Sequence, residues 1–204
     1  MAVHSSAKKR GNADKRDRIL RAAIKVFAKN GFYATRVSEI AKAAGVADGT
    51  IYLYFKNKDD VLITIFEDGI QQLRTILREV AAADEPFETR IKRIIELQLG
   101  LLEEQRDLAE VITVNLRQSS TLLKQYATPL FIEYIDVIAG LIREGQKQGA
   151  FRKEVNARVA ARSLFGALDA ILLTWALGEA DPASLRKAAS QCASLFLGGL
   201  QAQP

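Results

Sequence analysis

The 204-residue sequence predicts an all-α protein of about nine helices, with an N-terminal three-helix unit followed by a larger helical domain. Apolar residues recur at helical spacing from Asp14 almost to the end of the chain. No segment alternates apolar and polar residues between hairpin turns, as strands of a sheet would. The chain holds one cysteine, Cys192, and one histidine, His4, so a disulfide framework and a Cys/His zinc site are both excluded.

The first 57 residues are expected to form a basic arm and three helices. The expected ranges are 1–13 for a disordered arm, followed by helices at 14–30, 35–44 and 47–55. Gly31 and Gly45 follow helix ends and suit the left-handed conformation in which helices often stop. Thr35 precedes the second apolar stripe and is the expected N-cap. We therefore predict one domain at residues 14–57.

Residues 58–204 also show helical spacing and form the second predicted domain. Its expected helices are 58–82, 86–104, 107–118, 122–148, 156–177 and a last one capped by Asp181-Pro182 that ends at Gly198-Gly199. Asn57, with Asp60 three residues later, has the pattern of a capping box at the start of this domain. Thr128-Pro129 interrupts the fourth of these helices and marks either a new helix start or a kink.

The N-terminus has no apolar segment after its basic cluster, so it is not a secretory signal. No run reaches the roughly 18 apolar residues of a membrane span. These two observations predict a cytoplasmic protein with no membrane partner. The only histidine lies in the polar N-terminal arm, and no catalytic residue or metal site is expected, so the sequence does not favour an enzyme.

The positive charge is concentrated in the first 60 residues. They hold 13 Lys and Arg against 6 Asp and Glu, a net of +7, whereas residues 61–204 hold 16 against 18, a net of −2. A basic patch confined to one region is typical of a surface that binds a polyanion such as DNA. A basic tail that only aids solubility is the alternative.

The pattern of helix, tight Ala44-Gly45-Val46 turn and short helix is that of a helix-turn-helix motif. Ile51 and Phe55 are expected to face inward with Val46. The outward positions are then Ala47, Asp48, Gly49, Thr50, Tyr52 and Tyr54. Hydroxyl groups and very small residues suit a major groove, where they bond phosphates or base edges and allow close approach. The alternative is that the tyrosines only pack against the motif.

The segment from Ile19 to Leu62 resembles the DNA-binding domain of tetracycline-repressor-type (TetR) regulators. The matching stretches are IL-AAIKVFAKNGF, T-VSEIAKAAGV and GTIYLYFKNKDDVL. The resemblance implies a homodimer that binds palindromic double-stranded operator DNA, with a C-terminal domain that dimerises and binds a small-molecule effector. It implies DNA contacts at Thr35, Arg36, Ala47, Asp48, Gly49, Thr50, Tyr52, Tyr54 and Lys58. For Asp48 we favour capping of the recognition helix over readout of cytosine, because an acid repels phosphate.

Polar residues interrupt two apolar helices of the C-terminal domain. Asn115, Arg117 and Gln118 lie among apolar neighbours in one, and Asp169 and Trp175 lie in the other. A carboxylate in an apolar helix is costly unless it is paired, so Asp169 either pairs with an arginine or faces a ligand. Small residues around Gly166 in the same helix permit close packing, either across a dimer seam or within one chain.

The NLRQSS stretch and the R-LFGALD-I--TW pattern resemble those TetR-type repressors that control fatty-acid degradation. This resemblance implies no cofactor, but a long-chain acyl-CoA effector that releases the repressor from its operator. The candidate effector-binding residues are Arg106, Asn115, Arg117, Gln118, Asp169 and Trp175. Arg117 is the preferred partner for the coenzyme A phosphates.

Three alternatives stay open at this point. The first is a TetR-type regulator of efflux or other genes that responds to a different lipophilic ligand. The second is an enzyme that borrows the helical domain, and the third is a DNA-coating protein without sequence preference. A bound acyl-CoA, found by mass spectrometry, would favour the fatty-acid regulator over the first alternative.

Overall fold

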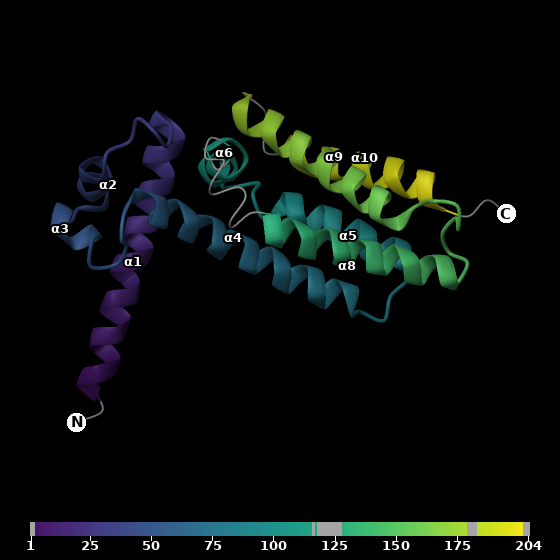
Figure 1. The fold of residues 1–204 in the computed structure, drawn as a ribbon, viewed down its shortest axis with the longest axis horizontal. Coiled ribbons are helices and arrows are strands. Elements are labelled where there is room, and N and C mark those ends of the chain that lie inside the picture. The colour runs from purple at the N-terminus through teal and green to yellow at the C-terminus, as the bar shows by residue number, and fades with distance from the viewer. Residues whose placement is uncertain (1–2, 116, 118–127, 179–182, 202–204) are drawn as a thin grey trace.

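The computed structural model describes residues 3–115, 117, 128–178 and 183–201, without the side chains of residues 3–12, 128, 130 and 183. In these ranges the chain forms nine α-helices, one π-helix and an isolated bridge between Phe151 and Gln201 (Figure 1). The α-helices are α1 (Val3–Asn30), α2 (Val37–Ala44), α3 (Asp48–Ile51), α4 (Lys58–Ala81), α5 (Phe87–Gly100), α6 (Arg106–Glu110), α8 (Thr128–Lys147), α9 (Ala157–Leu177) and α10 (Ala183–Leu200). The π-helix η1 (Val111–Asn115) continues α6. The predicted all-α class is confirmed.

Helices α1, α2 and α3 form the smaller lobe of the molecule, at the end opposite to α10 (Figure 1). Their apolar faces meet in one cluster that includes the fully buried side chains of Phe27, Ile40 and Ile51. Gly31 has a φ of 78° and Gly45 a φ of 63°, so both adopt the left-handed conformation expected at these helix ends. The helix-turn-helix arrangement is therefore built from local signals that the sequence carries.

Three local predictions in this lobe were wrong. Helix α1 begins at Val3, so the disordered arm expected at 1–13 is helical from that residue onward. Each residue added to an existing helix gains a hydrogen bond, and Ala, Lys and Arg are good helix formers. The N-cap of α2 is Arg36 rather than Thr35, because the Thr35 hydroxyl donates to the carbonyl oxygen of Gly31 at 2.8 Å. The third helix ends at Ile51 and continues to Tyr54 as turns.

Helix α4 joins the two lobes. It starts where expected, since the Asn57 side chain accepts a hydrogen bond from the Asp60 amide at 2.8 Å. Its first half buries Val61 and Phe66 in the N-terminal cluster, whereas its second half buries Leu77 and Val80 in the C-terminal cluster. A single continuous helix thus contacts both cores.

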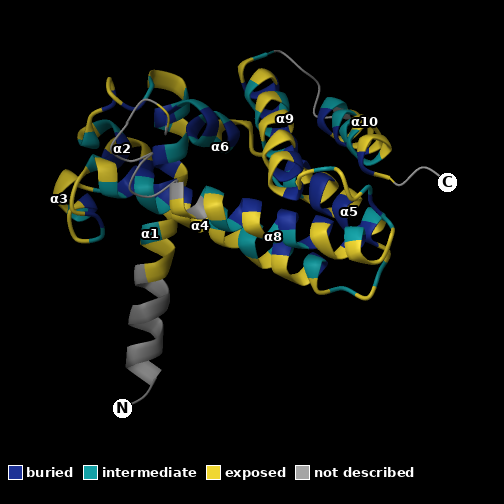
Figure 2. Cartoon of the chain, turned by 45° about the vertical axis from the view of Figure 1, so that its right-hand side comes forward, coloured by how far each residue is buried: buried dark blue, intermediate teal, exposed yellow. Residues whose placement is uncertain are grey.

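The larger lobe is a bundle in which α8 packs on α9 and α5 packs on α10. Buried residues lie on the sides of α5, α8 and α9 that face one another (Figure 2). Helix α6 and η1 lie between this bundle and α1 (Figure 1). In the described part of the helix predicted at 107–118, α6 is α-helical and η1 is π-helical. Helix α5 ends at Gly100, four residues before the predicted end at Glu104. The predicted cap at Asp181-Pro182 lies outside the described residues.

Helix α9 is long and apolar enough to cross a membrane by length and composition alone. It is not an uninterrupted apolar run, because charged residues such as Arg162 and Asp169 lie within it. The core helix of a globular bundle passes the same test of length and composition. Leu164, Leu168 and Leu172 of α9 are buried in the C-terminal cluster, as in such a core helix.

Candidate nucleic-acid interface and ligand cavity

Helix α3 and the turn after it present a mostly polar face to solvent. Ile51 is 1% exposed and Phe55 is also buried, so this side of the segment packs on the N-terminal cluster. Tyr52 is 57% exposed, and Ala47, Asp48 and Gly49 are exposed with a half-buried Thr50 beside them. The inward and outward sides predicted from the sequence are therefore present at these positions.

Two residues of this segment differ from the sequence prediction. Tyr54 is half-buried and packs against the N-terminal cluster, which is the packing role that stood as the alternative for the tyrosines. Leu53 is 80% exposed and was not among the predicted contacts. An exposed leucine between two tyrosines is a signal that could have been found, because apolar side chains can touch a thymine methyl group.

The predicted capping bond of Asp48 is not formed. The N-cap position of α3 is Ala47, and no side chain caps this end. Asp48 instead lies in the first turn of the helix, where a negative charge interacts favourably with the helix dipole. Its carboxylate therefore stabilises the start of the helix through its negative charge rather than through a capping hydrogen bond.

The structure gives Thr35 and Lys58 a different role from the predicted DNA contact. Thr35 is 2% exposed, and its hydroxyl is bound to the Gly31 carbonyl. The Lys58 ammonium donates to the carbonyl oxygens of Phe32, Tyr33 and Thr35 at 2.7, 3.1 and 2.9 Å. An ammonium has three donors, and all three are used. Both side chains thus hold the loop between α1 and α2, whose last residue, Arg36, is exposed.

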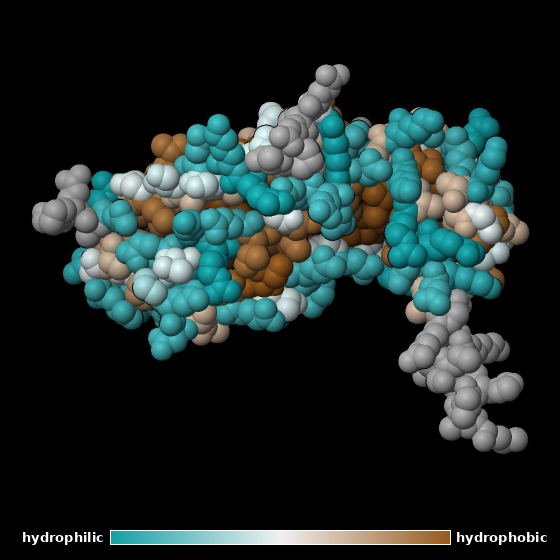
Figure 3. Space-filling model, turned by 180° about the vertical axis from the view of Figure 1, so that it is seen from behind, coloured by the Kyte–Doolittle hydropathy of each residue, from teal (hydrophilic) through white to brown (hydrophobic). Residues whose placement is uncertain are grey.

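A cavity lies where α4, α5, α6, η1, α8 and α9 meet. Its walls are mainly apolar and come from Phe66, Ile70, Leu73, Leu101, Leu102, Leu108, Ile112, Phe131, Phe165, Leu168 and Leu172. Apolar groups come to the surface in the hollow near the junction of the two lobes (Figure 3). Phe66 and Ile112 also belong to the N-terminal cluster, so the cavity borders the smaller lobe directly.

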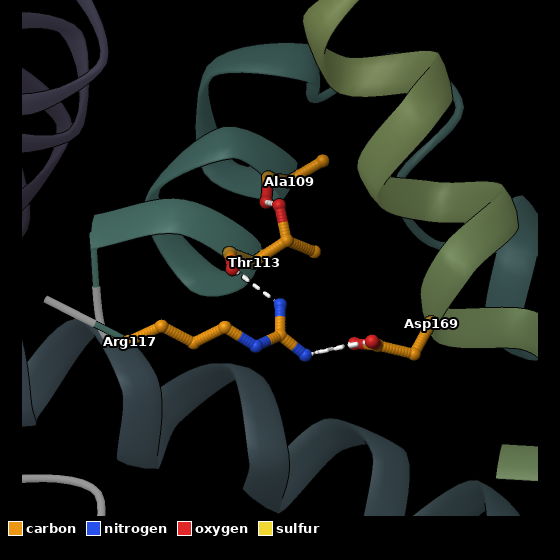
Figure 4. Close-up of polar contacts among 4 residues, drawn as sticks. All are labelled: Ala109, Thr113, Arg117 and Asp169. Carbon is orange, nitrogen blue, oxygen red and sulfur yellow. Dashed lines mark hydrogen bonds and ion pairs between the residues drawn. The ribbon is translucent and has the colours of Figure 1, made fainter. Parts of the chain in front are cut away.

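An ion pair lies in the otherwise mainly apolar wall of the cavity. The Arg117 guanidinium donates to both carboxylate oxygens of Asp169 at 2.6 and 2.7 Å and also to the Thr113 carbonyl oxygen (Figure 4). The Thr113 hydroxyl donates to the Ala109 carbonyl at 2.7 Å (Figure 4). The pairing that the sequence left open for Asp169 is therefore present, and both partners line the cavity. Paired charges can lie beside an apolar cavity at a lower cost than a single charge.

Asn115 does not face the cavity. Its side chain is 1% exposed, and its Oδ1 accepts a hydrogen bond from the backbone N–H of Phe32 at 2.7 Å. This bond joins η1, at the cavity, to the loop between α1 and α2 in the smaller lobe. A buried hydrogen bond between residues 83 positions apart is not visible in the sequence.

The other predicted effector residues are not brought together at the cavity. Trp175 is buried in the C-terminal cluster and does not line it. Arg106 donates from Nε to the Ala176 carbonyl at 3.0 Å and lines a separate groove beside α1. Gln118 lies outside the described residues. Within the described ranges, no group of three or more His, Cys, Asp or Glu could hold a metal ion.

Two ionisable groups of the larger lobe, Tyr134 and Glu110, have raised pKa values. Burial raises the pKa of the Tyr134 phenol, which stays neutral and donates to the Gln98 side chain of the cavity wall at 2.7 Å. Burial, with a smaller effect of Asp107, raises the pKa of Glu110 on α6.

Comparison with known proteins agrees with this division into two lobes. Residues 19–65 match the model of the bacterial regulatory proteins of the tetR family, and residues 66–199 match that of the C-terminal region of YsiA-like proteins. A curated relative, the fatty acid metabolism regulator protein of Bacillus subtilis, is 36% identical over 79% of this chain and 83% of its own length.

Solved structures show the same similarity. The fatty acid degradation regulator FadR from Bacillus halodurans superposes with a TM-score of 0.81 at 35% identity, covering 93% of this chain and 97% of that one. FadR from Bacillus subtilis in complex with stearoyl-CoA gives a TM-score of 0.78 at 32% identity, covering 89% and 97%. With its helix-turn-helix lobe, its helical C-terminal lobe and these matches over most of its length, the chain belongs to the TetR family of transcriptional regulators.

Proposed function

We propose that this regulator is a homodimeric repressor of fatty-acid degradation genes that leaves its operator when a long-chain acyl-CoA binds. The observation that carries the proposal is the apolar cavity, because two of its lining residues contact the core of the helix-turn-helix lobe: Phe66 is buried in that core, and Ile112 packs against it. A ligand in this cavity therefore touches side chains that pack in or against the N-terminal cluster, which also holds Ile51 of the recognition helix. The similarity to a FadR solved with stearoyl-CoA supports this class of ligand.

The acyl chain supplies most of the binding free energy. Each CH₂ group removed from water contributes about 0.8 kcal/mol, so long chains bind far more tightly than short ones. The cavity wall is suited to such a chain, since leucine, isoleucine and phenylalanine dominate it. The paired Arg117 and Asp169 present no unpaired charge to it.

Asn115 provides the physical connection from this cavity to the DNA-binding lobe. It lies at the end of η1, in the same short segment as the cavity residues Ile112 and Thr113. The π-helix is a rare geometry that often marks functional sites. When a ligand displaces Ile112, the bond from the Phe32 amide to Asn115 shifts with η1. The loop before α2 shifts in turn.

Release follows from the geometry of a dimer on DNA. Two recognition helices must lie about 34–36 Å apart, or a multiple of this, to enter successive major grooves. A ligand that binds more tightly to a dimer with another spacing lowers operator affinity by linkage, typically by about 1–3 kcal/mol. The DNA face that we propose comprises Arg36, Ala47, Asp48, Gly49, Thr50, Tyr52 and Leu53, while Thr35, Tyr54 and Lys58 hold it in place.

The test is a band-shift titration of the protein–operator complex with octanoyl-, dodecanoyl- and stearoyl-CoA. Free coenzyme A and stearate serve as controls. We expect release to become more effective as the chain lengthens, and free coenzyme A to have no effect. If no acyl-CoA moves the band, the effector is another lipophilic molecule and the proposal is wrong in its ligand.

A second arm of the experiment tests the connection through Asn115. Asn115→Ala leaves the buried Phe32 amide without its acceptor, at a cost of about 1–3 kcal/mol, and it should bind stearoyl-CoA while releasing DNA poorly. Thr64→Val is the matched control, because it removes a side-chain hydrogen bond of a half-buried residue that does not line the cavity and keeps the bond between Asn115 and Phe32. Normal release by Asn115→Ala would contradict this route.

A further inference from the structure

We propose that Asp169 makes the cavity selective for an acyl chain that ends in an uncharged thioester and against the ionised free fatty acid. The two molecules share the same apolar chain and differ in the group that ends it, which carries a negative charge only in the fatty acid. Asp169 achieves this selectivity by neutralising Arg117, its ion-pair partner in the cavity wall. This inference rests on the proposed acyl-CoA effector and names the residue that distinguishes it from the acid of the same chain length.

Asp169 lies on the face of α9 that lines the cavity. Phe165, Leu168 and Leu172 of the same helix also line it, at spacings of three and four residues from one another or from Asp169. Residues at these spacings share one side of a helix. Asp169 is therefore the charged member of an otherwise apolar surface, where a carboxylate is costly unless it has a partner.

Its partner, Arg117, is held from two sides. The guanidinium donates from Nη2 to both carboxylate oxygens of Asp169, at 2.6 and 2.7 Å, and from Nη1 to the carbonyl oxygen of Thr113 in η1 (Figure 4). Carbonyl groups at the end of a helix lack partners within it, so a side chain can bind there. An incoming carboxylate must therefore compete with Asp169 for the same nitrogen. A coenzyme A phosphate would meet the same competition, so the pair does not favour Arg117 as the phosphate partner expected from the sequence.

The rest of the cavity wall offers little to a carboxylate. Arg117 and Asp169 are the only charged residues among the described residues that line the cavity, so the charge of its wall sums to zero. The Gln105 amide and the Thr113 hydroxyl each donate to a backbone carbonyl four residues earlier in the chain. Transfer of a carboxylate from water to such a surface is costly, whereas a thioester has no charge to desolvate. The wall therefore favours the thioester.

Removing the charge of Asp169 should reverse this selectivity. Asp169→Asn keeps the shape of the side chain and an oxygen that accepts from Arg117, but it leaves the guanidinium without a counter-charge. Arginine binds carboxylates through charge-assisted hydrogen bonds from a planar fork of donors. The variant cavity should therefore hold a fatty acid with its carboxylate at Arg117. Because both side chains of the pair are partly exposed, solvent screening limits the expected gain to about tenfold.

The experiment measures the affinities of dodecanoyl-CoA, dodecanoate and dodecanol by calorimetry at neutral pH, where the acid is ionised. The alcohol keeps the chain and removes the charge. The full-length wild-type protein is compared with Asp169→Asn and with the double variant Asp169→Asn/Arg117→Gln, which removes both charges. Asp136→Asn is the matched control, because it makes the same substitution in an ion pair, with Arg158, that lies outside the cavity wall. Thermal melts show that each variant is folded.

We expect the wild-type protein to bind dodecanol more tightly than dodecanoate by about tenfold or more, a comparison that needs no variant. Asp169→Asn should bind dodecanoate about tenfold more tightly than the wild type does, whereas the double variant and Asp136→Asn should show no such gain. Equal binding of dodecanol and dodecanoate by the wild type, or no gain in Asp169→Asn, overturns the inference and leaves the proposed effector intact. A gain that persists in the double variant also overturns it, because the carboxylate then does not bind Arg117. If the wild type binds dodecanol but not dodecanoyl-CoA, the proposed effector fails and the selectivity against carboxylates stands.

Discussion

The two lobes of this regulator use charged side chains differently. In the smaller lobe, which carries the net positive charge, the side chains of Arg18, Arg21 and Lys25 have no carboxylate partner among the described residues. In the larger lobe most arginines that form ion pairs do so at 2.6–2.9 Å, as Arg93 does with Glu85. A cation that is already paired gains little from an external anion. The unpaired charges of the smaller lobe are therefore the ones available to an external polyanion.

The two hydrophobic cores also differ in how completely side chains fill them. The N-terminal cluster is filled by aromatic residues such as Phe27 and Phe32, whose rings lie 5.5 Å apart. The larger lobe leaves a cavity among its helices. A small domain buries too little apolar surface to give up packing, whereas a larger bundle can accommodate a cavity and remain folded. The ligand site is therefore expected in the larger lobe, next to the smaller one.

The largest expected effect is the loss of operator affinity as the salt concentration rises, which depends on the unpaired positive charges of the smaller lobe. If a bound dimer neutralises about six to ten phosphates, operator affinity should fall about 10³–10⁵-fold between roughly 50 and 200 mM salt. Lys56→Gln, at an exposed position after the recognition helix, should reduce the salt slope by about one for each phosphate that this lysine neutralises. Arg186→Gln, which removes a paired charge from the larger lobe, should leave the slope unchanged. Fluorescence anisotropy at several salt concentrations measures the salt slope of each protein. Equal slopes for the wild type, Lys56→Gln and Arg186→Gln would mean that charges of the two lobes do not differ in their contribution to DNA binding.

The next effect separates packing from contact within the recognition segment. Ile51→Ala should lower the free energy of unfolding by about 2–5 kcal/mol, because the side chain is fully buried. Tyr52→Ala should leave unfolding nearly unchanged and weaken operator binding by about 1–3 kcal/mol if the tyrosine contacts a base. Denaturant melts and operator titrations of both variants provide the measurement. If Tyr52→Ala unfolds the lobe and Ile51→Ala does not, the two sides have been assigned in reverse.

The smallest effect tests how tightly the larger lobe is packed away from its cavity. A Cβ at Gly145 would lie 2.3 Å from Cδ2 and 2.6 Å from Cε2 of the buried Phe151 ring. Gly145→Ala should therefore destabilise the protein by about 1–3 kcal/mol. Gly140→Ala, in the same helix α8 with no atom within 4 Å, should stabilise it by about 0.5–1 kcal/mol. Thermal unfolding compares the two, and equal melting temperatures would mean that the ring moves aside.

The sequence allowed accurate prediction of what local interactions control. Helical spacing predicted the all-α class, and Gly31 and Gly45 marked the ends of the first two helices. The division of the recognition segment into a buried Ile51 and an exposed Tyr52 also followed from spacing alone. These features depend on residues within about one or two helical turns, so a linear pattern contains them.

Only the tertiary structure decided which polar side chains are paired. Lys58 was expected to meet phosphate, yet it holds three carbonyls of a loop 23 to 26 residues earlier in the chain. Asn115 was expected to face a ligand, yet it joins the lobes through Phe32. Arg117 is paired with an aspartate 52 residues away. A hydrogen bond forms only when donor and acceptor come within about 3 Å in good alignment, and for residues so distant along the chain that meeting is set by helix packing.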